Sequence, residues 1–376
     1  MQPQEYRTSP TLIILPASPE DKSPNSVGVY DYLTKKYAYV SIANIYWFEY
    51  FSEKKSWAMV LADHKGANPE TLSYDISKLT DLGFLNVIDD SKTNRHDVFA
   101  KEWKWDVSSA IFHFTVLDNE FETAQDSASI QLSKLETENQ PALAWVNDKS
   151  AINLPSPFHG KSGELLSLMA KRRTNRTSTG HAITNEEIST CLFAGLGITG
   201  YVETPTGDLP LSMTPSGGAR NPFEAYVILN RGAELAPGIY HYSGAEHSLQ
   251  KLETAMPEQL HQFLANQEWT SDMAAVIVLV AVLERTMWKY SDANAYRVVL
   301  IEAGHIAQNI MVAATDLGLC ACPTAALAHG PLSQVLGLEA LTHTPIYALT
   351  LEKPLPYADK IYANPLLRDA INLLGQ

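Results

Sequence analysis

The sequence predicts an α+β fold that is preceded by a small winged-helix-like domain at the N-terminus. Two observations support this prediction. A helical pattern at 71–82 ends at Gly83 and is followed directly by an apolar strand at 84–88, which is typical of a winged helix. In the second half, apolar strands alternate with helices, among them a long helix at about 295–317. The 376 residues, 45% of them hydrophobic, suffice for two or three packed units.

The composition argues against several classes of function. The net charge of −14 and the pI near 5.2 argue against a large contact with nucleic-acid phosphates. Three sparse cysteines, Cys191, Cys320 and Cys322, indicate a reduced compartment and neither a disulfide framework nor a zinc site. The N-terminus lacks the pattern of a signal peptide, and the longest apolar run, 273–283, is too short to span a bilayer. We therefore expect a cytoplasmic protein with no nucleic-acid or membrane partner.

Residues 1–95 form the predicted winged-helix-like domain, in which strands at 11–15 and 37–42 precede the helix. Winged helices often bind DNA, but this helix carries a single basic residue, Lys78. Peptide binding fits the charge better than DNA binding does. A purely structural role for the domain stays open.

Residues 96–160 form a predicted polar connector with one aromatic island. The island contains Trp103, Trp105 and the run 111–115, and we expect it to pack onto the next domain. Within it, His113 is expected to be a packed or capping residue and not a ligand. The run Pro155-Ser156-Pro157 marks the expected boundary.

Residues 161–376 form the second predicted domain. Thr184 and Glu187 have the spacing of a capping box, and Gly197 or Gly200 ends the helix that they open. The other expected elements are a helix from 162 to 171, strands at 226–229, 238–242 and 345–351, a buried strand or helix at 273–283, and a helical tail from 365.

Two stretches of this domain have the composition of ligand-binding sites. Arg172, Arg173, Thr174 and Arg176 place three guanidinium groups and a hydroxyl just past a helix, which suits an anion such as phosphate. A solvated basic patch is the alternative. The turn 215–219, Pro-Ser-Gly-Gly-Ala, lets a backbone approach a ligand closely, although most such turns only reverse the chain.

Taken in order, the motifs resemble the nitroreductase superfamily of FMN enzymes. They are the arginine cluster, the glycine turn, Ala-Gly-His-Ile-Ala-Gln-Asn at 303–309 and Leu-Gly-Leu-Cys-Ala-Cys-Pro at 317–323. Pro-Gly-Ile-Tyr-His-Tyr at 237–242 and Trp-Lys-Tyr at 288–290 resemble more narrowly its SagB-type branch, the azoline oxidases that act on ribosomal peptides. The resemblance covers about 160–376 and implies a nitroreductase-like fold, a central antiparallel-rich sheet flanked by helices.

The resemblance implies an FMN site. Arg172, Arg173, Thr174 and Arg176 match the segment that holds the phosphate and ribityl groups. The turn Pro215, Ser216, Gly217, Gly218 and Ala219 matches the segment along the flavin ring, and Thr324, Ala325 and Ala326 match a loop whose backbone meets the ring. Lys353 stands where the family usually has an arginine, Glu302 where the branch more often has aspartate, and Ala-Leu-Ala-His follows the loop in place of a Gly-Phe-Asp-like stretch. No metal is expected.

The resemblance also implies that Lys289 and Tyr290 are catalytic. Oxidation of an azoline to its azole removes a proton from one ring carbon and a hydride from its neighbour. Flavin N5 accepts the hydride, and a lysine amine or a tyrosinate accepts the proton. Arg285 and Arg297 flank the pair and either bind substrate or form ion pairs. His305 is expected to be structural, and Cys320 and Cys322 are expected in the core.

The predicted function is therefore FMN-dependent oxidation of a heterocyclised peptide, with O2 reoxidising the flavin. The resemblance further implies a homodimer, a peptide substrate recognised through a leader segment by residues 1–95, and a complex with other biosynthetic enzymes. Two alternatives stay open: an NAD(P)H-dependent nitro or quinone reductase, and a non-catalytic binding protein with a degenerate flavin site.

Overall fold

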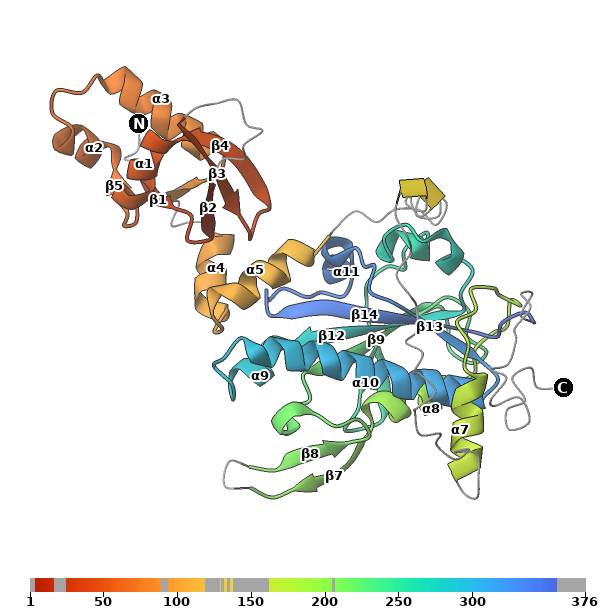
Figure 1. The fold of residues 1–376 in the computed structure, drawn as a ribbon. Helices are drawn as coiled ribbons and strands as arrows, with labels where there is room; N and C mark the ends of the chain where they lie inside the picture. The colour runs from red at the N-terminus through yellow and green to blue at the C-terminus, as the bar shows by residue number, and fades with distance from the viewer. Residues whose placement is uncertain are drawn as a thin grey trace, which may run out of the picture. The chain divides into compact units, whose positions relative to one another are not determined.

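The structure is a computed structural model that describes residues 4–16, 25–88, 94–118, 162–204 and 207–356, together with 129, 132–133 and 136–137. The chain divides into two compact units (Figure 1). The first comprises Met1–Leu117 and Ser291–Asn294, and the second comprises Asp118–Tyr290 and Ala295–Gln376.

The first unit contains two three-stranded antiparallel sheets and several short helices. The first sheet has the order β5 (Lys55–Ser56), β1 (Glu5–Thr8), β6 (Leu85–Ile88), and the second has the order β2 (Leu12–Pro16), β3 (Ser26–Asp31), β4 (Lys36–Ser41). The helices before β6 are η1 (Ile42–Asn44), α1 (Ile45–Tyr50), α2 (Trp57–Asp63) and α3 (Pro69–Asp81).

The helix–glycine–strand pattern lies where the sequence predicts it. Asn68 caps α3 by accepting a hydrogen bond from Glu70 N, and Gly83 leaves the helix with a φ of +78°. β6 then pairs with β1 at the start of the chain. The winged-helix classification of this unit stays a prediction.

A buried carboxylate holds the first unit together. Asp31 is fully buried and accepts hydrogen bonds from Ser9 Oγ at 2.8 Å and Thr11 Oγ1 at 2.7 Å, and His96 Nε2 lies 3.0 Å from its Oδ2. The backbone N–H groups of Leu33 and Thr34 donate to its Oδ1. Burial alone would raise the pKa of Asp31, but the side-chain hydrogen bonds, led by that of His96, lower it to about 2.

The segment after 95 is more ordered than the sequence predicts. Two helices, α4 (Arg95–Glu102) and α5 (Val107–Val116), belong to the first unit and begin at the caps Asn94 and Asp106. The aromatic island packs on itself, because the Trp103 ring contacts those of Phe99 and Phe114. His113 is fully buried against them, as expected for a packed residue.

The second unit is built around a six-stranded antiparallel sheet (Figure 1). Its strand order is β11 (Ser248–Lys251), β10 (Gly238–Ser243), β9 (Phe223–Leu229), β12 (Ala275–Val282), β14 (His343–Glu352), β13 (Cys320–Thr324). The run 273–283, for which strand and helix stayed open, contains strand β12, and all eight of its residues are buried. A position in the middle of the sheet explains its unbroken apolar sequence.

Helices pack on this sheet. α11 (His329–Val335) and η3 (Leu260–Phe263) share one apolar cluster with β9, β10, β12 and β14. α8 (Asn185–Leu196) and α10 (Asn294–Asp316) pack closely together, because a Cβ on Gly195 would lie 2.8 Å from Ile310 Cγ1. The capping box of Thr184 and Glu187 is present, and Gly197 is the C-cap.

α10 is the one helix in the described ranges that is long and apolar enough to cross a membrane. Ten of its residues are buried in the protein, including Ala303, Ile306 and Ile310. A core helix passes the same test of length and composition, so this is weak support for a membrane span.

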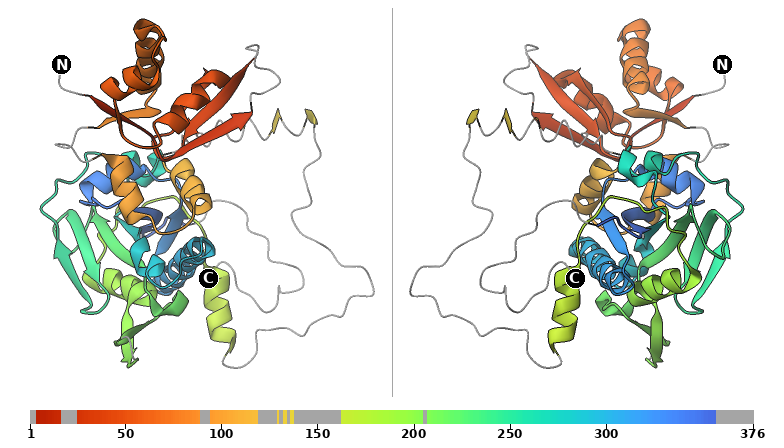
Figure 2. Two further views of the ribbon diagram at one scale, coloured as in Figure 1. Left: turned by 90° about the vertical axis from the view of Figure 1, so that its left-hand side faces the viewer. Right: turned by 90° about the vertical axis from the view of Figure 1, so that its right-hand side faces the viewer.

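The remaining elements of the second unit are short. They are α7 (Ser162–Lys171), β7 (Ile198–Val202), β8 (Leu209–Ser212), η2 (Gly217–Ala219), η4 (Glu268–Thr270) and α9 (Leu283–Met287). The β7–β8 hairpin extends from the body of the unit (Figure 2). The expected boundary at 155–157 and the helical tail from 365 lie outside the described residues.

Candidate functional site

The glycine turn 215–219 joins the β7–β8 hairpin to β9 in a strained conformation. Gly218, Ala219 and Asn221 all have positive φ, of 63°, 53° and 44°. Left-handed backbone costs free energy at the two non-glycine residues, and such strain is concentrated at functional sites. Hydrogen bonds hold the turn in place: Asn221 N donates to Ser216 Oγ at 2.8 Å, and Ser212 Oγ donates to Asn221 Oδ1 at 2.9 Å.

Lys289 and Tyr290 meet this turn, although they lie 71 residues later in the chain. Both follow α9, and their backbone N–H groups donate to Thr286 O. A Cβ built on Gly218 would lie 2.5 Å from Tyr290 Oη and 2.7 Å from Lys289 Nζ. The two polar side-chain ends therefore lie against the Cα of Gly218, and Lys289 Nζ is also 5.5 Å from the centre of the Tyr290 ring.

Glu302, a buried acid on α10, holds the glycine turn by hydrogen bonds. The Glu302 carboxylate accepts a hydrogen bond from Gly217 N at 3.2 Å and another from Ser216. Burial raises the pKa of Glu302 and outweighs these two hydrogen bonds, which act in the opposite direction. Two helical turns further on, Asn309 Nδ2 donates to Thr214 Oγ1 at 2.9 Å. One face of α10 thus fixes the start of the turn.

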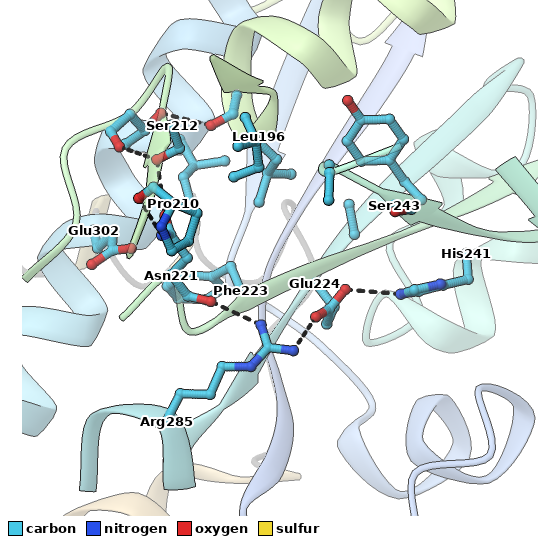
Figure 3. A pocket seen from close by; sticks show the side chains of 18 of the residues that line it. Leu196, Pro210, Ser212, Asn221, Phe223, Glu224, His241, Ser243, Arg285 and Glu302 are labelled. Atoms are coloured by element: carbon cyan, nitrogen blue, oxygen red, sulfur yellow. Dashed lines mark hydrogen bonds and ion pairs between the residues drawn. The ribbon is translucent and has the colours of Figure 1, made fainter. Parts of the chain in front are cut away.

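A cavity of about 360 Å³ lies beside the turn (Figure 3). Its polar side contains Arg285, Glu224 and His241, which point toward one another. Arg285 pairs with Glu224 and donates to Asn221 O at 2.8 Å, and His241 Nε2 lies 2.9 Å from the Glu224 carboxylate. Burial would raise the pKa of Glu224, but the contacts with His241 and Arg285 lower it.

Of the two roles left open for Arg285, the structure shows the ion pair, at the edge of the cavity. Sequence reasoning missed Glu224 and His241. A signal for them exists: His241 faces Tyr226 across the β9–β10 pair, so Glu224, two residues before Tyr226, lies diagonally on the same face. Arg297 and His305 are exposed residues of α10.

The arginine segment follows α7 and packs against β13 and the end of β14. Asn175 N donates to Cys320 Sγ at 3.3 Å, and Thr179 N donates to Lys353 O at 3.2 Å. Arg173 Nη1 donates to two carbonyl groups, those of Ala170 at 2.7 Å and Arg172 at 2.8 Å.

Two of the arginines in this segment lie near the cysteines of β13. Burial raises the pKa of Cys322 to about 11, and the positive charges of Arg176 and Arg172 oppose this rise. The guanidinium of Arg176 also lies 5.2 Å from the Trp269 ring. Cys320 and Cys322 are buried, as the sequence predicts, and neither forms a disulfide.

The loop after β13 is fixed by Gln267. Thr324 Oγ1 accepts hydrogen bonds from Gln267 Nε2 at 2.9 Å and from Ala326 N at 3.1 Å. Ala325, between them, is exposed. Lys353 is exposed at the end of β14.

Within one chain the predicted site residues form two separate groups. The glycine turn leads into Phe223, which is opposite Ala281, and Ala281 is opposite Thr344 near the start of β14. The arginine segment contacts Lys353 just past the end of β14. Arg176 contacts Cys322, which is opposite Thr350, six residues along β14 from Thr344. At about 3.4 Å per residue, this arginine and the start of β14 lie roughly 20 Å apart along the strand. Figure 1 likewise shows α9 and α7 near opposite ends of α10.

Comparison with known proteins places this architecture in a family. Residues 169–351 match the model of the nitroreductase family. This part of the chain belongs to the nitroreductase superfamily, whose members generally bind flavin, and lies on its McbC-like branch. The nitroreductase-like fold, with its antiparallel sheet and flanking helices, confirms the predicted fold class.

Three relatives illustrate the placement. The chain is 29% identical over 195 residues to MJ1384 of Methanocaldococcus jannaschii, whose name assigns it provisionally to the nitroreductases, covering 52% of this chain and 93% of that protein. It is 29% identical to the trifolitoxin-processing protein TfxB of Rhizobium leguminosarum bv. trifolii, covering 39% of this chain and 41% of TfxB. It is 25% identical to the microcin B17-processing protein McbC of Escherichia coli, and the match covers 35% of this chain and 50% of McbC.

A solved structure shares the fold. A chain of the E. coli microcin synthetase McbBCD complex with truncated pro-MccB17 aligns over 70% of this chain and 98% of its own length. The TM-score is 0.50 and the identity is 18%. This structural likeness supports the fold. In sequence, the chain spans only about half the length of McbC and less than half that of TfxB.

Proposed function

We propose that the chain is an FMN-dependent dehydrogenase that oxidises the azoline ring of a heterocyclised peptide to the azole in natural-product biosynthesis. The observation that carries this proposal is the position of the Lys289 and Tyr290 side-chain ends against Gly218. Similarity to two peptide-processing proteins, TfxB and McbC, supports a peptidyl substrate. The proposal also places this protein in the cytoplasm.

The residues present suit an FMN molecule, which would supply the two-electron acceptor. Arg172 and Arg176, with Lys353 nearby, provide cationic donors for a phosphate group. Gly217 and Gly218 give the turn no side chains of its own, and the space beside them is taken by Val298 and by the ends of Lys289 and Tyr290, so in this proposal the ring lies against those two ends. Arg173 has its Nη1 engaged by two carbonyl groups, so in this proposal it orients the segment.

The proton chemistry belongs to the chain's own residues. The azoline loses a proton from one ring carbon as its neighbour loses a hydride, and the Lys289 amine or the Tyr290 phenolate accepts that proton. The Lys289 amine and the Tyr290 hydroxyl lie close together, because both contact Gly218. Arg285 holds α9 to the turn through Asn221 O and thus positions the pair.

The separation of the two residue groups supports a homodimer. Neither group alone offers both phosphate donors and a ring-binding turn, and they lie at opposite ends of β14. A second copy, related by a two-fold axis, would bring the turn of one chain to the arginine segment of its partner. Recognition of a leader peptide by the first unit, and assembly with other biosynthetic enzymes, are further parts of the proposal.

The test uses the full-length protein loaded with FMN and a synthetic thiazoline peptide. Lys289→Ala and Tyr290→Phe are expected to keep the flavin absorbance and to lose oxidation by at least about 100-fold, in line with the removal of a general base. Full activity in both variants contradicts the assignment. Rapid bleaching of the flavin by NADPH without air, with no peptide oxidation, would favour a nitro or quinone reductase.

A further inference from the structure

An exposed tryptophan lies directly before the proposed catalytic pair. Trp288 is 70% exposed, which is unusual for so large an apolar side chain. The Arg220 guanidinium lies 5.3 Å from the centre of its ring. Arg220 also donates from Nε to Gly218 O at 3.1 Å. The Arg220 guanidinium, which is bonded to the glycine turn, therefore lies over the Trp288 indole, directly before Lys289 in the chain.

Trp288 and Arg220 form one wall of a second hollow, of about 380 Å³. The hollow is lined by Asp208, Leu209, Pro210, Ala219, Arg220, Arg285 and Trp288. The charged groups of this hollow are the guanidinium groups of Arg220 and Arg285 and the Asp208 carboxylate, and Arg285 is already paired with Glu224. Pro210 and Arg285 also line the 360 Å³ cavity, so the two hollows meet at these residues.

We propose that this hollow is a substrate subsite, in which Trp288 and Arg220 hold a planar ring of the peptide that flanks the ring being oxidised. This inference rests on the proposed function, in which the ring being oxidised is an azoline of a peptide. The flanking ring is a neighbouring azole or an aromatic side chain, and both offer the flat face that stacks on an indole.

The chemistry of the hollow suits a peptide. Guanidinium groups donate hydrogen bonds to carbonyl oxygens, and Arg220 is fixed by contacts with both Gly218 O and the Trp288 ring. Successive residues of an extended peptide are about 3.4 Å apart. Arg220, which lies over Trp288, and the ends of Lys289 and Tyr290 all contact Gly218, so we expect a ring on Trp288 to belong to a residue close in sequence to the reacting ring.

The experiment measures peptide binding by calorimetry with the FMN-loaded, full-length protein. The probes are three pentapeptide amides, Gly-Gly-X-Gly-Gly, in which X is a thiazole amino acid, Phe or Ala. We expect the wild-type protein to bind one or both ring-containing probes between about twofold and tenfold more tightly than the Ala probe, the range for one aromatic contact. The relative affinity of the thiazole and Phe probes distinguishes the two sources of the ring.

The variants decide whether Trp288 is responsible. Trp288→Ala is expected to abolish the preference and Trp288→Phe to keep part of it. The matched control is Ile301→Ala, which removes a large apolar side chain that is 52% exposed on α10 and lines neither hollow. Absence of a ring preference in the wild-type protein, absence of binding, or a preference that survives Trp288→Ala overturns the subsite. The proposed function fails separately, if Trp288-dependent binding is present but no thiazoline peptide is oxidised.

Discussion

Gly218 has a φ of +63°, and a Cβ at this position would collide with the ends of Lys289 and Tyr290. Gly218→Ala therefore combines backbone strain of about 1 kcal/mol with displacement of both side chains. We expect turnover of a thiazoline peptide to fall roughly 10- to 100-fold while flavin stays bound, because small misplacements of reacting groups are costly. The measurement is a steady-state oxidation assay with the flavin content recorded.

Gly337 provides a matched control for this substitution. Its φ is +68°, but a Cβ there meets nothing within 4 Å. Gly337→Ala should lower the free energy of unfolding by a similar amount and leave turnover of the thiazoline peptide unchanged. Equal loss of activity in the two variants would show that strain alone, and not the contact with the catalytic pair, explains the effect at Gly218.

Asp31 gives a prediction for acid stability. Its pKa is lowered from 3.8 to about 2 in the folded state, so the folded protein favours the ionised form. The stability that this contributes, about 2 kcal/mol, is present above pH 4 and is lost as the pH falls toward 2. Asp31→Asn should weaken the first unit at pH 7 and remove this part of its pH dependence. The check is urea unfolding at several pH values, and an unchanged slope between pH 4 and 2 in the variant contradicts it.

The sequence indicated candidate site residues but not which of them lie next to one another. The positions of Lys289 and Tyr290 were predicted by resemblance, but no spacing in the chain indicates that they meet Gly218, 71 residues away. The same limit applies to Glu224 and His241, whose proximity depends on the register of β9 and β10. Long-range contacts of this kind come from tertiary packing, which local patterns do not encode.

At the scale of single elements, strong local signals were sufficient. The capping box of Thr184 and Glu187 predicted the start of α8, because two backbone–side-chain hydrogen bonds depend on four adjacent residues. β12 could not be distinguished from a helix, since a strand buried on both faces has no alternating pattern. α4 and α5 were missed, although Asn94 and Asp106 are caps. α4 has a polar sequence, and the apolar run 111–115 of α5 was interpreted as an aromatic island within a connector.

The cap of α8 yields a prediction at this scale. Thr184 Oγ1 accepts a hydrogen bond from Glu187 N at 3.2 Å, and Glu187 accepts one from Thr184 N at 2.8 Å. Thr184→Ala should lower the free energy of unfolding of the second unit by about 1 kcal/mol, the usual cost of losing a cap. Thr184→Ser, which keeps the hydroxyl, should restore most of it. Chemical denaturation monitored on both variants tests this, and equal stability of Ala and Ser variants would exclude a capping role.

For the whole molecule, the fold class was predicted from the sequence, and the resemblance implied a homodimer whose two chains share the FMN site. Local patterns along one chain do not show how far apart the motifs lie in space. The structure separates the arginine segment from the glycine turn along β14. In the proposed function a second chain completes the site, and this proposal leads to the last prediction.

Mixing two inactive variants should restore activity if the site is shared. In one variant Arg172→Ala and Arg176→Ala remove phosphate donors, and in the other Lys289→Ala removes a proton acceptor. A mixed dimer then contains one site with both defects and one with none, because each site takes its arginines from one chain and its lysine from the other. Random reassociation yields half mixed dimers, so we expect about a quarter of wild-type turnover after co-refolding or co-expression. The control is each variant reassociated with itself, and sedimentation confirms the dimer. If all groups of a site came from one chain, the mixture would stay as inactive as its parents.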